Sequence, residues 1–192
     1  MKSAAGIQER PISGSETALR LLLLGLALAL ILSAVGPLLS RAFAAAPDVV
    51  SVKLDASQIQ PRPLEQLTGQ AIVKTYSNAW KNMETALAEN RPDLIDESFV
   101  GYAHDKLASE IKAQQKNGLS TRYLDHGHQV QATFYSPEGS AVQLQDTASL
   151  EVQLLDGDKV ISSENVTRKY IAVVTVVEDG WKVRILDGVP GF

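Results

Sequence analysis

The sequence contains no cysteine. Disulfide bonds, thiolate metal ligands and cysteine nucleophiles are therefore excluded, although an exported protein can also lack disulfides. A basic surface is missing as well. Of 18 basic and 22 acidic side chains, residues 1–44 hold four and two, so the remainder has 14 and 20, a net charge of −6. Because nucleic acid attracts basic surfaces, we expect no nucleic-acid partner.

Motifs that carry familiar chemistry are also absent. The sequence has no Gly-rich phosphate loop, no nucleophile elbow and no zinc-binding helix motif. We therefore predict no cofactor, no metal and no catalytic residue, and we favour a non-enzymatic protein over an enzyme.

One long apolar run stands near the N-terminus. Residues 21–40 carry no charge, and twenty helical residues span about 30 Å, the hydrocarbon thickness of a bilayer. Two interpretations stay open: an uncleaved transmembrane anchor over residues 21–43, and a signal peptide cleaved near Ala44. Both leave the short basic segment 1–20 inside and the C-terminal domain outside the cytoplasm. We predict a single-pass membrane protein, with a periplasmic or secreted protein as the alternative.

Two further regions follow the apolar run. Residues 44–65 are predicted to be a tether, since three prolines interrupt them, and residues 66–192 to be one α+β domain. The prolines are Pro47, Pro61 and Pro63. An alternation of apolar residues inside the tether, at Val50, Val52 and Leu54, allows a short edge strand.

The first half of the domain has helical periodicity. Apolar residues between positions 64 and 88 recur at spacings of three to five, which predicts an amphipathic helix with one buried stripe. The stripe contains Leu64, Leu67, Ile72, Tyr76, Ala79, Trp80, Met83 and Leu87. Asn90-Arg91-Pro92 ends this helix. A short helical piece over Asp93–Phe99 and a longer helix from about Tyr102 to the C-cap at Gly118 follow.

After Gly118 the period changes to two, which predicts strands. The last two form a hairpin whose loop is Asp179-Gly180, so that Glu178 faces Trp181. The domain is therefore predicted to hold two to three N-terminal helices on a four-stranded antiparallel sheet, preceded by one apolar helix.

This element order, with the glycine cap at Gly118 and the closing hairpin of residues 170–183, resembles the cystatin-like, nuclear transport factor 2-like superfamily. The nearest sub-pattern is the membrane-anchored domain of cyanobacterial and chloroplast division proteins, and mycobacterial Mce-associated membrane proteins have a similar plan. The resemblance covers about residues 66–187. It implies a curved sheet wrapped on a long helix with a cone-shaped pocket between them, a fold that hosts isomerases, dehydratases, ligand binders and interaction modules.

Three histidines are candidates for chemistry. His126 and His128 are two residues apart, so both share one face of a strand unless Gly127 forms a bulge. Two imidazoles do not complete a metal site, and the third histidine, His104, lies on a helix, so we predict no metal centre.

A ligand pocket between the first helix and the sheet is the second candidate site. The resemblance includes ketosteroid isomerase, which uses pocket carboxylates and a tyrosine. The candidate ligand-binding residues here are Tyr76, Tyr123, His126 and His128. A tyrosine in a buried helical stripe, however, is more often a packing residue.

A row of uncharged polar residues marks the outer face of the sheet, including Gln129, Gln131, Gln143 and Gln145. Such a surface costs less to desolvate than one rich in lysine and glutamate, and interface cores are depleted in charge. We therefore predict a non-enzymatic, extracytoplasmic domain that binds a protein partner or a second copy of itself. The alternative is a small-molecule-binding or minor isomerase or lyase-type domain.

Overall fold

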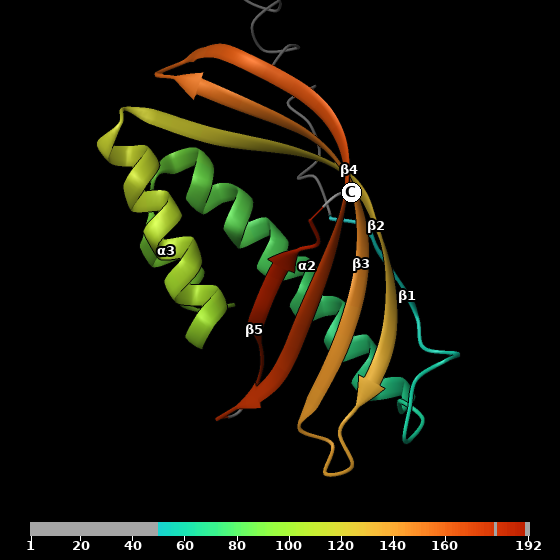
Figure 1. The fold of residues 1–192 in the computed structure, drawn as a ribbon. Helices are drawn as coiled ribbons and strands as arrows, with labels where there is room; N and C mark the ends of the chain where they lie inside the picture. The colour runs from blue at the N-terminus through green and yellow to red at the C-terminus, as the bar shows by residue number, and fades with distance from the viewer. Residues whose placement is uncertain (1–49, 179, 191–192) are drawn as a thin grey trace, which may run out of the picture. The chain divides into compact units, whose positions relative to one another are not determined.

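A single sheet of five strands, in the order β1-β2-β3-β4-β5, organises the fold (Figure 1). The computed structural model describes residues 50–178 and 180–190. Strand β1 runs parallel to β2, and the other neighbouring strands are antiparallel. The strands are β1 (Val52–Asp55), β2 (Leu119–Tyr135), β3 (Ala141–Asp156), β4 (Lys159–Val177) and β5 (Gly180–Gly188).

The prediction of a four-stranded antiparallel sheet is therefore wrong, because the sheet is mixed and has a fifth strand. That strand, β1, comes from residues expected to be a tether. Its partner in β2 is distant in sequence, with Val52 opposite His128. A parallel pair has no connecting hairpin turn, so the short alternation in the sequence gave no sign of where β1 would pair.

The described residues contain two α-helices, α2 (Gln66–Glu89) and α3 (Gly101–Lys116), and one 3-10 turn, η1 (Pro92–Ile95). The predicted range of two to three helices narrows to two, since the short piece at Asp93–Phe99 is only partly helical. Its last residues instead lie along β5, where the Val183 N–H donates to the Ser98 carbonyl at 2.9 Å. Residues committed to a strand edge in this way cannot continue a helix.

Helix α2 buries the stripe that the sequence predicts. Residues of that stripe that are at most 5% exposed are Ile72, Tyr76, Ala79, Trp80, Met83 and Leu87. Leu64 is partly buried, and Leu67 is exposed, with 78% of its surface accessible. The helix ends at Asn90, whose φ of 55° is left-handed, a conformation that asparagine tolerates.

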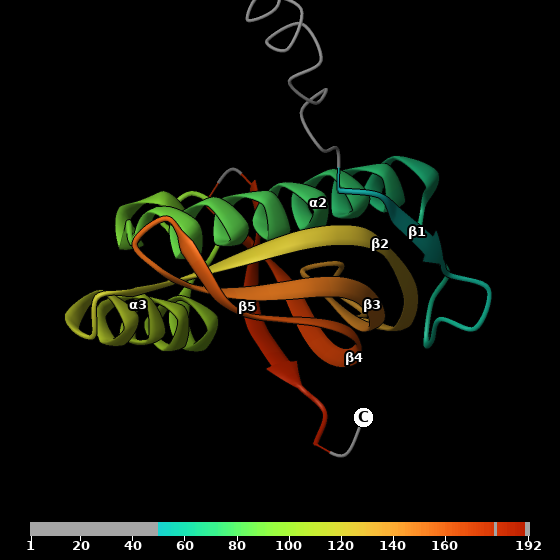
Figure 2. The ribbon, with the colours of Figure 1, turned by 90° about the horizontal axis from the view of Figure 1, so that it is seen from above.

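The sheet curves around α2, and both helices cover its inner face (Figures 1 and 2). Within the described residues, no helix is both long and apolar enough to cross a membrane. The apolar helix predicted over residues 21–43 lies outside the described residues.

The predicted C-terminal hairpin is present, but its register differs from the prediction. Trp181 lies opposite Val176, and Gly180 lies opposite Val177. Glu178 has a φ of 52°, so the chain already reverses at this residue. The Asp-Gly signal therefore locates the turn correctly, whereas packing of the inward side chains sets which residues face each other.

Candidate functional site

A carboxylate, an imidazole and a phenol meet inside the domain. Asp146 on β3 is 1% exposed and accepts a hydrogen bond from the Tyr76 hydroxyl of α2, at 2.9 Å to Oδ2. The same oxygen lies 2.7 Å from Nδ1 of His128 on β2, a side chain with no exposed surface. The other imidazole nitrogen, Nε2, lies 3.5 Å from Oδ1 of Asp125, whose side chain is 4% exposed. The buried Asp146 carboxylate is therefore paired with a phenol and an imidazole, which offset the cost of removing it from water.

A β-bulge places the histidine in this cluster. Gly127 has a φ of +123°, and the register of β2 shifts between Asp125 and Gly127. The Gly127 N–H donates to Oδ1 of Asp125 at 2.6 Å, which holds the bulge in place. His128 consequently points inward, while His126 is exposed on the other side. The two histidines do not share a face, as the sequence analysis anticipated for a bulge at this glycine.

Aromatic side chains cover the cluster. The Trp80 ring lies 4.4 Å from the His128 ring, centroid to centroid. Tyr170 and Tyr123 stand edge-on to the indole at 5.2 and 6.5 Å. Trp80 is 1% exposed, so it fills the region between the first helix and the sheet where a ligand pocket was expected.

Burial also determines the chemistry of the tyrosines. Loss of solvent and the nearby charge of Asp146 raise the pKa of Tyr76 well above its ordinary value of 10. Burial raises the pKa of Tyr123 to about 12. Both phenols therefore remain protonated at neutral pH, and the Tyr76 hydroxyl donates to Asp146. A proton-transfer role for Tyr76 would also require access to a substrate, and this side chain is only 1% exposed.

A small cavity lies beside Tyr123 and Tyr170 of this aromatic group. Its volume is about 200 Å³, and Met83, Leu87, Leu107, Tyr123, Arg168 and Tyr170 are among the residues that line it. Ligand pockets usually enclose about 300–1,000 Å³, so this cavity is small for a drug-sized compound. Of the predicted ligand-binding residues, Tyr123 alone lines it.

The outer face of the sheet carries a larger hollow. Its volume is about 360 Å³, and Gln129, Gln131 and Gln145 line it together with Ile171 and Val189. Gln131 and Gln145 face each other across β2 and β3, and Gln145 faces Ile171 on β4. Three of the four predicted interface residues therefore meet in one depression. The fourth is Gln143, which lies on β3 opposite Val173 and is not part of the hollow's lining.

The third histidine has a different environment. His104 on α3 lies 2.9 Å from Oδ1 of Asp96 and 3.2 Å from Oδ1 of Asp105. These hydrogen bonds raise the pKa of His104 above its ordinary 6.5. In the described part of the chain, no group of three or more histidine, cysteine or acidic side chains is placed to hold a metal ion.

Sequence reasoning missed Asp146, the residue that joins the buried cluster. One signal was present: Asp146 occupies an inward position of an otherwise apolar alternation that includes Leu144 and Ala148. A charged residue at such a position requires a buried partner. The sequence does not identify that partner, because Tyr76 and His128 lie 70 and 18 residues away.

Comparisons with known proteins address the fold. No family model and no curated protein matches the sequence. The structure is similar to the intermembrane-space region of the chloroplast protein ARC6, with a TM-score of 0.57 and 16% identity over 67% of this chain and 98% of that one. A Nostoc punctiforme protein with a cystatin-like fold (10% identity, 67% and 96% coverage) and Aln2 from a Streptomyces species (11%, 65% and 92%) score 0.40 and 0.42.

The resemblance stated from the sequence is therefore confirmed for the fold. The described domain shares its fold with the ARC6 intermembrane-space region. At these identities the likeness extends to the fold alone, and the function must be argued from the site.

Proposed function

We propose that this domain is a non-enzymatic protein-interaction module that binds a partner protein through the outer face of its sheet. The glutamine-lined hollow over β2, β3 and β4 is the observation that carries the proposal. We define the glutamine face as Gln129, Gln131 and Gln145, with Ile171 at its border.

The interior supports this function over the small-molecule alternative. Trp80 and Met83 are 1% and 4% exposed, so they occupy the space that a ligand would need. The Tyr76 hydroxyl already donates to Asp146, and Nδ1 of His128 lies 2.7 Å from the same carboxylate, which leaves Nε2 of His128 as a single imidazole nitrogen without a hydrogen-bond partner among the described residues. A binding site needs convergent polar groups that are free to contact the ligand.

The glutamine face has the composition of an interface centre. Glutamine amides supply donors and acceptors without the desolvation cost of a full charge. Ile171 is 39% exposed and adds apolar area beside them. Interface cores combine apolar area with few charges, and the charged residues in the lining of this hollow are Lys169 and the buried Asp146.

The location of the module rests on the N-terminal apolar run. Either an uncleaved anchor over residues 21–43 or a signal peptide cleaved near Ala44 would deliver the domain to the far side of the membrane. We propose an extracytoplasmic partner accordingly.

Site-specific photocrosslinking tests the proposal. A photoreactive amino acid replaces Gln129 in cells that naturally make the protein, and adducts are identified by mass spectrometry. A matched control carries the same amino acid in place of Gln115, which is exposed on α3. We expect a defined protein adduct from position 129 and none from position 115.

A charge variant makes the test specific. Because Gln131 and Gln145 are direct cross-strand neighbours, the double variant Gln131→Lys/Gln145→Glu places opposite charges together and preserves the pairing. It should abolish the adduct at position 129 while leaving the urea unfolding midpoint unchanged. Persistence of the same adduct in this variant would remove the glutamine face as the binding surface.

A further inference from the structure

The two edges of the sheet differ in how their backbone groups are satisfied. At β5, residues 98–100 cover the edge: the Val183 N–H donates to the Ser98 carbonyl at 2.9 Å, and the Val100 N–H donates to the Val183 carbonyl at 3.0 Å. Beside β1, the Ser77 hydroxyl donates to the carbonyl of Val50, two residues before the strand begins, at 2.8 Å. An open strand edge is a template for another strand.

The parallel pairing of β1 shows which of its groups are free. The His128 N–H donates to the Ser51 carbonyl, so Ser51 and, by alternation, Lys53 direct their backbone groups toward β2. Val52 and Leu54 therefore direct their N–H and C=O groups away from β2. The residues that the structure describes provide no hydrogen-bond partner for these outward groups.

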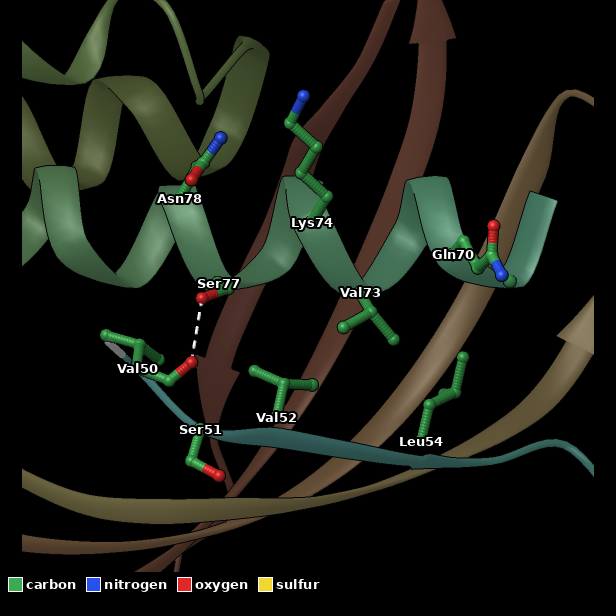
Figure 3. A pocket seen from close by; sticks show the side chains of 10 residues that line it. Val50, Ser51, Val52, Leu54, Gln70, Val73, Lys74, Ser77 and Asn78 are labelled. Atoms are coloured by element: carbon green, nitrogen blue, oxygen red, sulfur yellow. Dashed lines mark hydrogen bonds between the residues drawn. The ribbon is translucent and has the colours of Figure 1, made fainter. Parts of the chain in front are cut away.

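A groove runs beside this edge, between β1 and α2, with a volume of about 660 Å³. In Figure 3 the side chains of Val52 and Leu54 point toward the helix, where Val73 faces them, while Ser51 points the other way. An incoming strand would thus find backbone partners on β1 and an apolar recess for alternate side chains.

The helix presents an exposed apolar residue near the same groove. Leu67, at 78%, is the most exposed large apolar side chain of the described residues. It precedes Gln70 and Lys74, which line the groove, by three and seven positions, so the three share one face of α2.

We propose that the occupant is a second copy of this chain, paired antiparallel through β1 around a two-fold axis at Leu54. Facing residues of an antiparallel pair must match in backbone direction, outward opposite outward and inward opposite inward, which restricts the possible registers. In the register centred on Leu54, Lys53 of each copy faces Asp55 of the other. The two symmetry-related pairs therefore both join opposite charges. In the register centred on Lys53, two lysines oppose each other, and like charges directly opposite destabilise a strand pair.

This pairing goes beyond the proposed function, because it uses the β1 edge and not the glutamine face. It joins the two sheets into one. Each Leu54 side chain then lies beside its symmetry mate at the mouth of the two grooves, where its apolar surface leaves water.

The absence of cysteine permits a direct test in the full chain. In an antiparallel hydrogen-bonded pair, facing Cα atoms lie about 5.5 Å apart, within the range that a disulfide bridges. Under mild oxidation of the protein in the cells that make it, Leu54→Cys should give a disulfide-linked dimer. Ser162→Cys, an exposed position near the β3–β4 turn, is the control and should stay monomeric.

Charge variants test the register. Lys53→Glu alone places like charges in both cross-strand pairs, and so does Asp55→Lys alone. Each should raise the dimer dissociation constant at least about fivefold, measured by sedimentation of the detergent-solubilised chain. An equimolar mixture of the two variants should restore association, because both pairs in the mixed dimer are complementary.

Three results would overturn the proposal. The first is a monomeric wild-type chain in which Leu54→Cys links no faster than Ser162→Cys. The second is linkage of Leu54→Cys to a different protein, which would assign the edge to a strand of another partner. The third is failure of the mixed charge variants to associate while the wild type does.

Discussion

Removing the Tyr76 hydroxyl tests whether the buried cluster is structural. In Tyr76→Phe the ring keeps its position in the α2 stripe, but Asp146 loses a hydrogen bond of 2.9 Å. Both residues are 1% exposed, so water cannot replace the hydroxyl. A hydrogen bond to a charged group contributes about 1.5–3 kcal/mol. We therefore expect the free energy of unfolding to fall by about 2 kcal/mol.

The assay is equilibrium unfolding of residues 48–192 in urea, followed by a thermal scan. A loss of about 2 kcal/mol corresponds to a decrease of about 6 °C in Tm for a domain of this size. Tyr102→Phe is the matched control, because Tyr102 is 55% exposed, and exposed substitutions usually change stability by less than about 0.5 kcal/mol. Equal stabilities for the two variants would refute the structural role of the cluster.

Two further predictions concern the bulge and the surface histidine. Gly127→Ala should cost about 1–3 kcal/mol in unfolding experiments, because its φ of +123° is strained for alanine, whereas Gly180→Ala, with open space around the added methyl, should be nearly neutral. The raised pKa of His104 predicts a contribution to stability that is complete below its ordinary pKa of 6.5 and lost as pH rises through the raised value. Because the pair with Asp96 is partly exposed, stability relative to His104→Gln should fall by about 0.5 kcal/mol between about pH 6 and pH 9, and an equal pH dependence in both proteins would contradict this.

Much of the secondary structure could be predicted because its causes are local. The spacing of Ile72, Tyr76 and Trp80 records which side of α2 is buried, and the structure confirms that stripe. The alternation of β3 is equally direct, because successive side chains of a strand face opposite sides of the sheet. The element order was also sufficient to identify a fold that the ARC6 intermembrane-space region shares.

The candidate sites were less predictable, because they depend on contacts between distant segments. The sequence singled out Tyr76 and His128 separately, but the carboxylate that joins them, Asp146, comes from a third element. The glutamines were predicted to share a face from their alternation alone. Their gathering in one hollow depends on the register between β2 and β3, which places Gln131 opposite Gln145.

The sequence by itself determined the position of most helices and strands and the buried face of the first helix. Each of these follows from a period of 3.6 or 2 along the chain. Only the tertiary structure decided the parallel pairing of β1, the bulge that separates His126 from His128, and the sealing of the interior by Trp80. These features arise from packing between residues far apart in the chain, and a local pattern carries no information about which distant partner a side chain will contact.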